Sequence, residues 1–128
     1  MTVQEITIST PWAITTAILC GLTCLIHTFI GTREVSPSLR SLEEGPRLTL
    51  TYAWHAVSLV LLTMTLGYVA PLFIPGTEAV FAFAQALTLL MCVLGFAMNA
   101  VVRPSSWTVL PQGFLFAGIF VCGTIALL

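Results

Sequence analysis

The chain contains no lysine and no aspartate, and charged residues of every kind make up only 7% of its 128 residues. A soluble domain carries roughly a quarter charged residues, so this chain has too few to cover a surface that faces water. Hydrophobic residues make up 58% of the sequence. The scarcity of charge therefore predicts an integral membrane protein, and the net charge of -1 gives no reason to expect a nucleic-acid partner.

Several functional signatures are also missing. No basic segment precedes the first apolar run, so we expect no cleaved signal peptide. The four cysteines fall in apolar segments and form neither a disulfide framework nor a paired zinc motif. The sequence has no phosphate-binding loop, no metalloprotease motif and no arrangement of a nucleophile with a base, so we expect a protein that is not an enzyme.

Long apolar segments dominate what remains, and each approaches the roughly 20 residues that a helix needs to cross a bilayer core. The expected helices lie at residues 11–31, 47–69, 78–102 and 107–128. The start of the last helix stays open, because Pro111 would interrupt a helix that began at Ser106. Only the first connection, residues 32–46, is long. The pattern predicts a single all-α domain of four transmembrane helices in an antiparallel up-and-down bundle.

Arginine sets the expected orientation. Arg33, Arg40 and Arg47 fall in or beside the first connection, and Arg103 falls in the third. The N-terminal segment and the second connection carry no basic residue. The positive-inside rule therefore places the arginine-bearing loops in the cytoplasm and both termini on the opposite side.

The only two histidines, His27 and His55, lie in neighbouring apolar segments. At the helical rise, His27 is about 9 Å from Arg33 and His55 is about 12 Å from Arg47. The two imidazoles are therefore expected at similar depth, in the cytoplasmic leaflet. Asn99 and Gln112 are expected at the same level, so these four side chains form one candidate site.

Helical spacing predicts which faces point inward. The polar and small residues of each of the first three helices share one face, which should turn away from lipid. These sets are Thr16, Cys20, Thr23 and His27; Thr51, His55, Ser58 and Thr65; and Gln85, Thr88, Cys92 and Asn99. The fourth helix offers two pairs of small residues four positions apart that would permit close helix packing, Gly113 with Ala117 and Gly118 with Cys122.

The histidines admit several interpretations. They could simply make hydrogen bonds between helices. They could be the two axial ligands of a b-type haem held between helices. Together with Trp54 and Tyr52 they could bind a quinone headgroup. A soft-metal site at Cys24 and His27, and a proton carrier that relies on histidine, are further alternatives.

Three segments, "LIHTFIGTREVSPSL", "LTYAWHAVSL" and "VLPQGFLF", resemble a family of small four-helix inner-membrane proteins of proteobacteria, especially alphaproteobacteria. The resemblance implies a bacterial inner-membrane location, in which the orientation expected from the arginines makes both termini periplasmic. It also implies that the matching positions form one site, without implying a chemistry for it. These positions are His27, Gly31, Arg33, Trp54, His55, Pro111, Gln112 and Gly113.

The small extramembrane mass favours a non-catalytic function. We expect an accessory or scaffold subunit that packs against a larger membrane complex, with a respiratory or photosynthetic complex as the candidate host, or that forms a homo-oligomer in the lipid bilayer. The alternative is an electron-transfer protein that binds b-type haem or a quinone through His27 and His55.

Overall fold

The computed structural model describes residues 7–128, apart from the side chain of Trp107, and the described chain is all-α. Its α-helices are α1 (Thr10–Leu25), α2 (Thr32–Leu39), α3 (Glu44–Phe73), α4 (Glu78–Val102) and α5 (Gln112–Leu127). A π-helical turn, η1 (Ile26–Gly31), joins α1 to α2 without a break, and a short 3-10 turn, η2 (Trp107–Val109), precedes α5.

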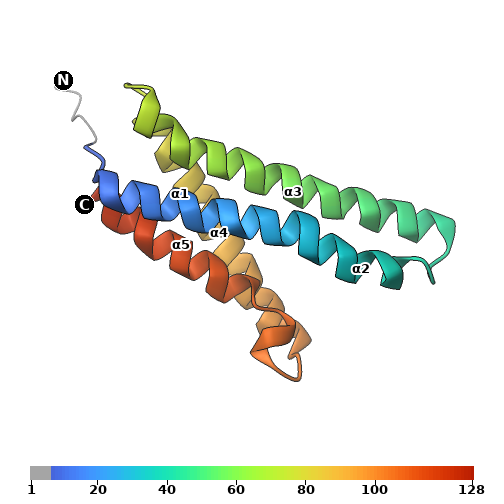
Figure 1. Cartoon of the computed structure of the whole chain (residues 1–128). Coiled ribbons are helices and arrows are strands. Elements are labelled where there is room, and N and C mark those ends of the chain that lie inside the picture. The colour runs from blue at the N-terminus through green and yellow to red at the C-terminus, as the bar shows by residue number, and fades with distance from the viewer. Residues whose placement is uncertain (1–6) are drawn as a thin grey trace.

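Four helical rods pack together in the described chain: the continuous α1–η1–α2 helix, α3, α4 and α5 (Figure 1). α3 contacts α1 and α4, while α5 contacts α4 and α1. The amide of Ser9 donates a hydrogen bond to the carbonyl oxygen of Ala126 at 2.8 Å, which ties the start of α1 to the end of α5. At the other end of the molecule, the α2–α3 hairpin and the α4–α5 connection diverge (Figure 1).

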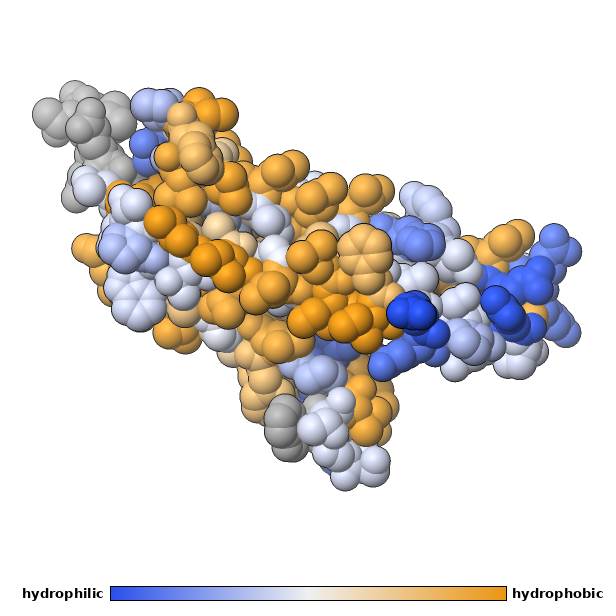
Figure 2. Space-filling model, viewed as in Figure 1, coloured by the Kyte–Doolittle hydropathy of each residue, from blue (hydrophilic) through white to orange (hydrophobic). Residues whose placement is uncertain are grey.

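Three helices of the described chain are long and apolar enough to cross a membrane: Thr10–Leu39, Glu44–Phe73 and Glu78–Val102. The first two have 30 residues each, about 45 Å of helix against a hydrocarbon core of about 30 Å. The fourth helix, α5, has only 16 residues. Apolar residues cover most of the visible surface, and strongly hydrophilic residues gather on the part that holds the α2–α3 hairpin (Figure 2).

On α1 and α3 the buried core lies in the half of the bundle that holds the termini. α1 contributes Ala13, Ala17 and Cys20, and the core residues of α3 begin at Leu61. Within residues 7–128, η1 and α2 contain no buried residue at all. The bundle is therefore closed around the termini and open toward the α2–α3 hairpin.

A polar network crosses the closed half. The Tyr68 hydroxyl donates to Gln85 Oε1 at 2.9 Å and also bonds the Thr88 hydroxyl. Gln85 Nε2 donates to the carbonyl oxygen of Phe120 at 2.7 Å and to Thr124 Oγ1 at 2.9 Å. The network links α3, α4 and α5, and it pairs polar groups that lipid could not satisfy.

The inward faces expected from helical spacing are largely present. Thr16 and Cys20 of α1 are buried, as are Gln85, Thr88 and Cys92 of α4. His55 differs, because its side chain is exposed on α3. On α3 the core positions are Leu61, Met64 and Tyr68, and the inward position nearest to His55 is taken by Trp54, which is half-buried.

The helix ends differ from those expected at three places. The first helix continues through Leu39, where residues 32–46 were expected to be a loop, and it does so despite Pro37. α3 begins at Glu44 and ends at Phe73, beyond the expected 47–69. α5 begins at Gln112 rather than at residue 107, because Leu110 precedes a proline and is held out of the helical conformation at φ -136°. The bounds of α4 coincide with the expected 78–102.

Candidate functional site

Trp54 of α3 packs against the part of the first helix where η1 passes into α2. The His27 ring stacks on the indole with ring centroids 4.1 Å apart and planes inclined by 18°. The indole Nε1 donates a hydrogen bond to Thr32 Oγ1 at 2.9 Å. A Cβ at Gly31 would lie 2.8 Å from Trp54 Cζ2, so the absence of a side chain there lets the indole lie against the helix.

The π-helical turn supplies two of these contacts, because it contains both His27 and Gly31. A π-turn accommodates one extra residue and so shifts the phase of the residues that follow it relative to those before it. His27 Nε2 lies 3.3 Å from the carbonyl oxygen of Trp54. The imidazole is thus positioned by its ring face and by one ring nitrogen, both against the same residue.

A cleft of about 700 Å³ opens beside this contact, between η1 and α2, α3, and the residues that lead into α5. We call it the loop-end cleft. His27, Trp54, Gln112 and Glu34 are among the residues that line it. Most of its other lining is aliphatic or aromatic, including Ile26, Val57, Leu61, Leu115 and Phe116. Its volume lies within the range of small-molecule sites, about 300–1,000 Å³.

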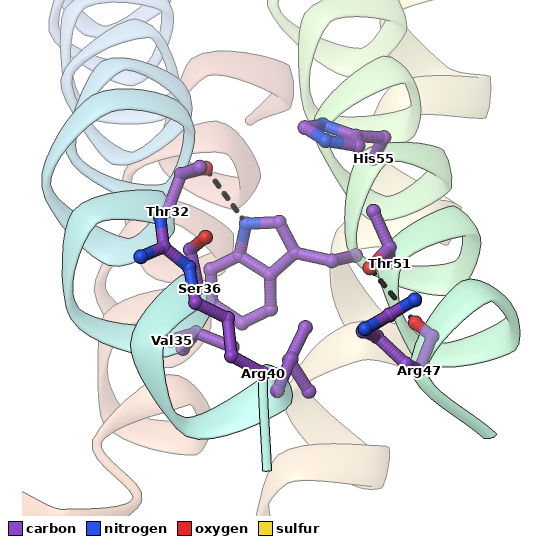
Figure 3. A pocket seen from close by; sticks show the side chains of 9 residues that line it. Thr32, Val35, Ser36, Arg40, Arg47, Thr51 and His55 are labelled. Carbon is purple, nitrogen blue, oxygen red and sulfur yellow. Dashed lines mark hydrogen bonds between the residues drawn. The ribbon is translucent and has the colours of Figure 1, made fainter. Parts of the chain in front are cut away.

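His55 lines a different cavity. It lines a pocket of about 120 Å³ at the α2–α3 hairpin (Figure 3), and Trp54 lines both cavities. Asn99 lines neither of these two cavities in the described structure. Its Nδ2 donates to the carbonyl oxygens of Gly95 and Leu110, at 3.0 and 2.9 Å, and so holds the connection between α4 and α5. The loop-end cleft therefore brings His27, Trp54 and Gln112 together. His55 shares only the smaller pocket with Trp54, and Asn99 lines neither of the two.

These positions do not fit a haem with His27 and His55 as axial ligands. Such a haem needs both imidazoles to point a nitrogen at one iron from opposite faces. Here the two histidines line different cavities, and the Nε2 of His27 lies 3.3 Å from the backbone carbonyl oxygen of Trp54. Among the described residues, no group of three or more histidine, cysteine or acidic side chains is placed to hold a metal ion.

The small residues of α5 divide between two environments. A Cβ at Gly113 would lie 3.0 Å from the backbone nitrogen of Phe96, so Gly113 packs directly on α4. Ala117 and Cys122 are half-buried, and Ala117 packs against the core. Gly118 faces open space, because no described atom beyond its own stretch of helix lies within 4 Å of the position of an added Cβ.

Three important positions were not singled out from the sequence: Tyr68, Gly95 and Gly123. Gly95 contacts the backbone of Gly113, and Gly123 makes room for the Gln85 side chain. A signal was available for Gly95, which follows Cys92 by three residues on the inward face of α4. Gly123 gave no such signal, because it follows Gly113 by ten residues and so lies about 80° away from it around the helix.

Comparison with models of protein families, with curated proteins and with solved structures finds no match for this chain. No family is therefore identified by comparison. The described residues form a small all-helical protein with three candidate membrane spans, which suggest a multi-pass protein of a lipid bilayer.

Proposed function

We propose that this chain is a small, non-catalytic subunit that packs against a larger membrane complex. The observation that carries the proposal is the loop-end cleft, where the helices fail to close on one another over about 700 Å³. In a bilayer, that space must be filled by lipid or by another helix. α5 adds to the gap because its 16 residues reach only about 24 Å, less than the hydrocarbon core.

The outer surface of α5 supports the same function. Gly118 is exposed, and no described atom occupies the space in front of it. Small residues on a lipid-facing helix let a second helix approach closely, which favours association where no hydrophobic effect drives it. A partner helix could therefore pack along α5 next to the mouth of the loop-end cleft.

The four helices would form an antiparallel bundle in a bacterial inner membrane, as the resemblance to small inner-membrane proteins implies. Arg33, Arg40, Arg47 and Arg103 would face the cytoplasm by the positive-inside rule, with both termini in the periplasm. The host would be a respiratory or photosynthetic complex.

Photo-crosslinking from inside the cleft tests the proposal. A benzophenone amino acid would replace Leu115, which is exposed and lines the loop-end cleft. Leu90 of α4 is the matched control, since it is also exposed and apolar but does not line the cleft. In native membranes we expect a discrete protein adduct from position 115, in good yield, and at most a weak diffuse product from position 90.

A quinone or similar ring lipid is the second candidate occupant, favoured by the His27 imidazole and the Gln112 amide at the edge of an apolar cavity. The same experiment separates the two functions. Adducts from position 115 that carry only a small isoprenoid would support quinone binding and contradict the subunit proposal. Equal protein adducts from positions 115 and 90 would show that the cleft has no special role in partner binding.

A further inference from the structure

A second cavity, at the tip of the α2–α3 hairpin, has a chemistry of its own. It measures about 120 Å³, and we call it the hairpin pocket. Its walls come from the end of the first helix and the start of α3 (Figure 3). The nine residues that line it include Thr32, Ser36, Arg40, Arg47 and Trp54.

The charged side chains that line the hairpin pocket are both arginines and therefore both positive. Arg40 reaches the pocket from the end of α2 and Arg47 from the first turn of α3 (Figure 3), and none of the nine described lining residues is acidic. Two guanidinium groups that share a small cavity repel each other unless an anion lies between them. Guanidinium groups bind phosphate oxygens through paired, charge-assisted hydrogen bonds.

Two hydroxyl groups and the Trp54 indole complete the lining of the pocket. The Thr32 hydroxyl accepts from the Trp54 indole at 2.9 Å, so its own hydrogen is free to be donated to a ligand. Ser36 presents a second hydroxyl from the next turn of α2. The Trp54 indole is held by this bond and by the stacked His27 ring. This wall of the pocket therefore has a fixed position before any ligand binds.

The position of the pocket along the helices favours a lipid as the source of the anion. The helices Thr10–Leu39 and Glu44–Phe73 have 30 residues each, which exceeds the hydrocarbon core by about 15 Å. The hairpin tip therefore extends to the level of the lipid headgroups. The apolar surface of the spans begins next to it (Figure 2), where the acyl chains of a bound lipid could lie.

We propose that the hairpin pocket binds the phosphate of an anionic phospholipid headgroup between Arg40 and Arg47. Basic pockets between transmembrane helices suit such headgroups. A zwitterionic lipid would bring its own cation against the two arginines and bind more weakly. The proposal does not depend on the existence of a partner complex, because it concerns only residues of this chain and the bilayer around it.

Native mass spectrometry of the full chain in mild detergent tests the site. The protein would be titrated with equal amounts of phosphatidylglycerol and phosphatidylcholine. We expect phosphatidylglycerol adducts to predominate on the unmodified chain. Arg40→Gln and Arg47→Gln should each weaken phosphatidylglycerol binding roughly tenfold, the loss expected for one charge-assisted contact.

Arg33→Gln is the matched control. Arg33 lies on the same helix as the pocket and is exposed, but it does not line the pocket, and its replacement removes the same charge. We expect binding within about twofold of the unmodified chain. Circular dichroism would verify that each variant remains helical. Should Arg47→Gln fail to fold, Arg40→Gln carries the test alone, because Arg40 is exposed and lies at the end of α2.

Three results would overturn the proposal. An equal loss of phosphatidylglycerol binding in Arg33→Gln would show that the lipid responds to the overall positive charge of this end of the protein and not to the pocket. Equal binding of phosphatidylcholine would remove the selectivity for an anion. Millimolar inorganic phosphate could displace the lipid and bind between the same two arginines. That result would make the pocket a site for a soluble anion instead of a lipid.

Discussion

Gly95→Ala is expected to lower the free energy of unfolding of the bundle by about 3 kcal/mol, the upper part of the range for an overpacked interface. A Cβ at position 95 would lie 2.5 Å from the backbone nitrogen of Gly113 and 2.6 Å from its Cα. These are backbone atoms, so no rotamer change can relieve the contact. α4 and α5 would have to move apart along the interface that joins them.

Thermal unfolding in one detergent, followed by circular dichroism at 222 nm, would measure this effect. Gly118→Ala provides the control, because the space in front of Gly118 is open and the substitution also favours helix. We expect Gly118→Ala to leave the stability within about 0.5 kcal/mol or to raise it slightly. Similar losses in the two variants would contradict the close packing of α4 on α5.

The second large effect is expected at Gly123. An alanine Cβ there would overlap Oε1 of Gln85, which is buried. Gln85 would then have to give up its hydrogen bonds to Tyr68, Phe120 and Thr124. Because a buried amide without partners costs about 1–3 kcal/mol, we expect Gly123→Ala to destabilise the bundle by about 2 kcal/mol.

A double-mutant cycle with Gln85→Ala isolates the cause. When the Gln85 side chain has been removed, the space that it occupied can accept the new methyl group. Gly123→Ala should then cost less than about 0.5 kcal/mol in the Gln85→Ala background, so that the two substitutions are coupled by more than about 1 kcal/mol. Additive losses would mean that the position of Gln85 does not depend on the glycine.

The bounds of α4 could be predicted because local signals agree at both ends. Thr77 precedes the helix, Glu78 begins it, and Pro104 follows it. The continuation of the first helix to Leu39 could not be predicted, because hydropathy marks only the part of a helix that lies inside the bilayer. Residues 32–39 are polar and include a proline, and their helix packs on α3 through contacts such as the bond from Trp54 to Thr32.

The candidate site shows a different limit of sequence patterns. Trp54 and His55 are adjacent, so they differ by about 100° around α3. The polar residues Thr51 and Ser58 favoured His55 as the inward residue, whereas the large indole takes that position. The loop-end cleft arises from the divergence of two hairpins, and no single helix encodes that angle.

The composition of the native assembly tests the central claim most directly. The tagged chain would be extracted from its own membrane in mild detergent, and the intact mass and the polypeptides of the purified species would be determined. We predict a species much larger than the 13.8 kDa chain that contains at least one different membrane protein in fixed stoichiometry. Recovery of the chain alone, as a monomer or as a homo-oligomer, under conditions that preserve other complexes of that membrane would contradict the proposed subunit function.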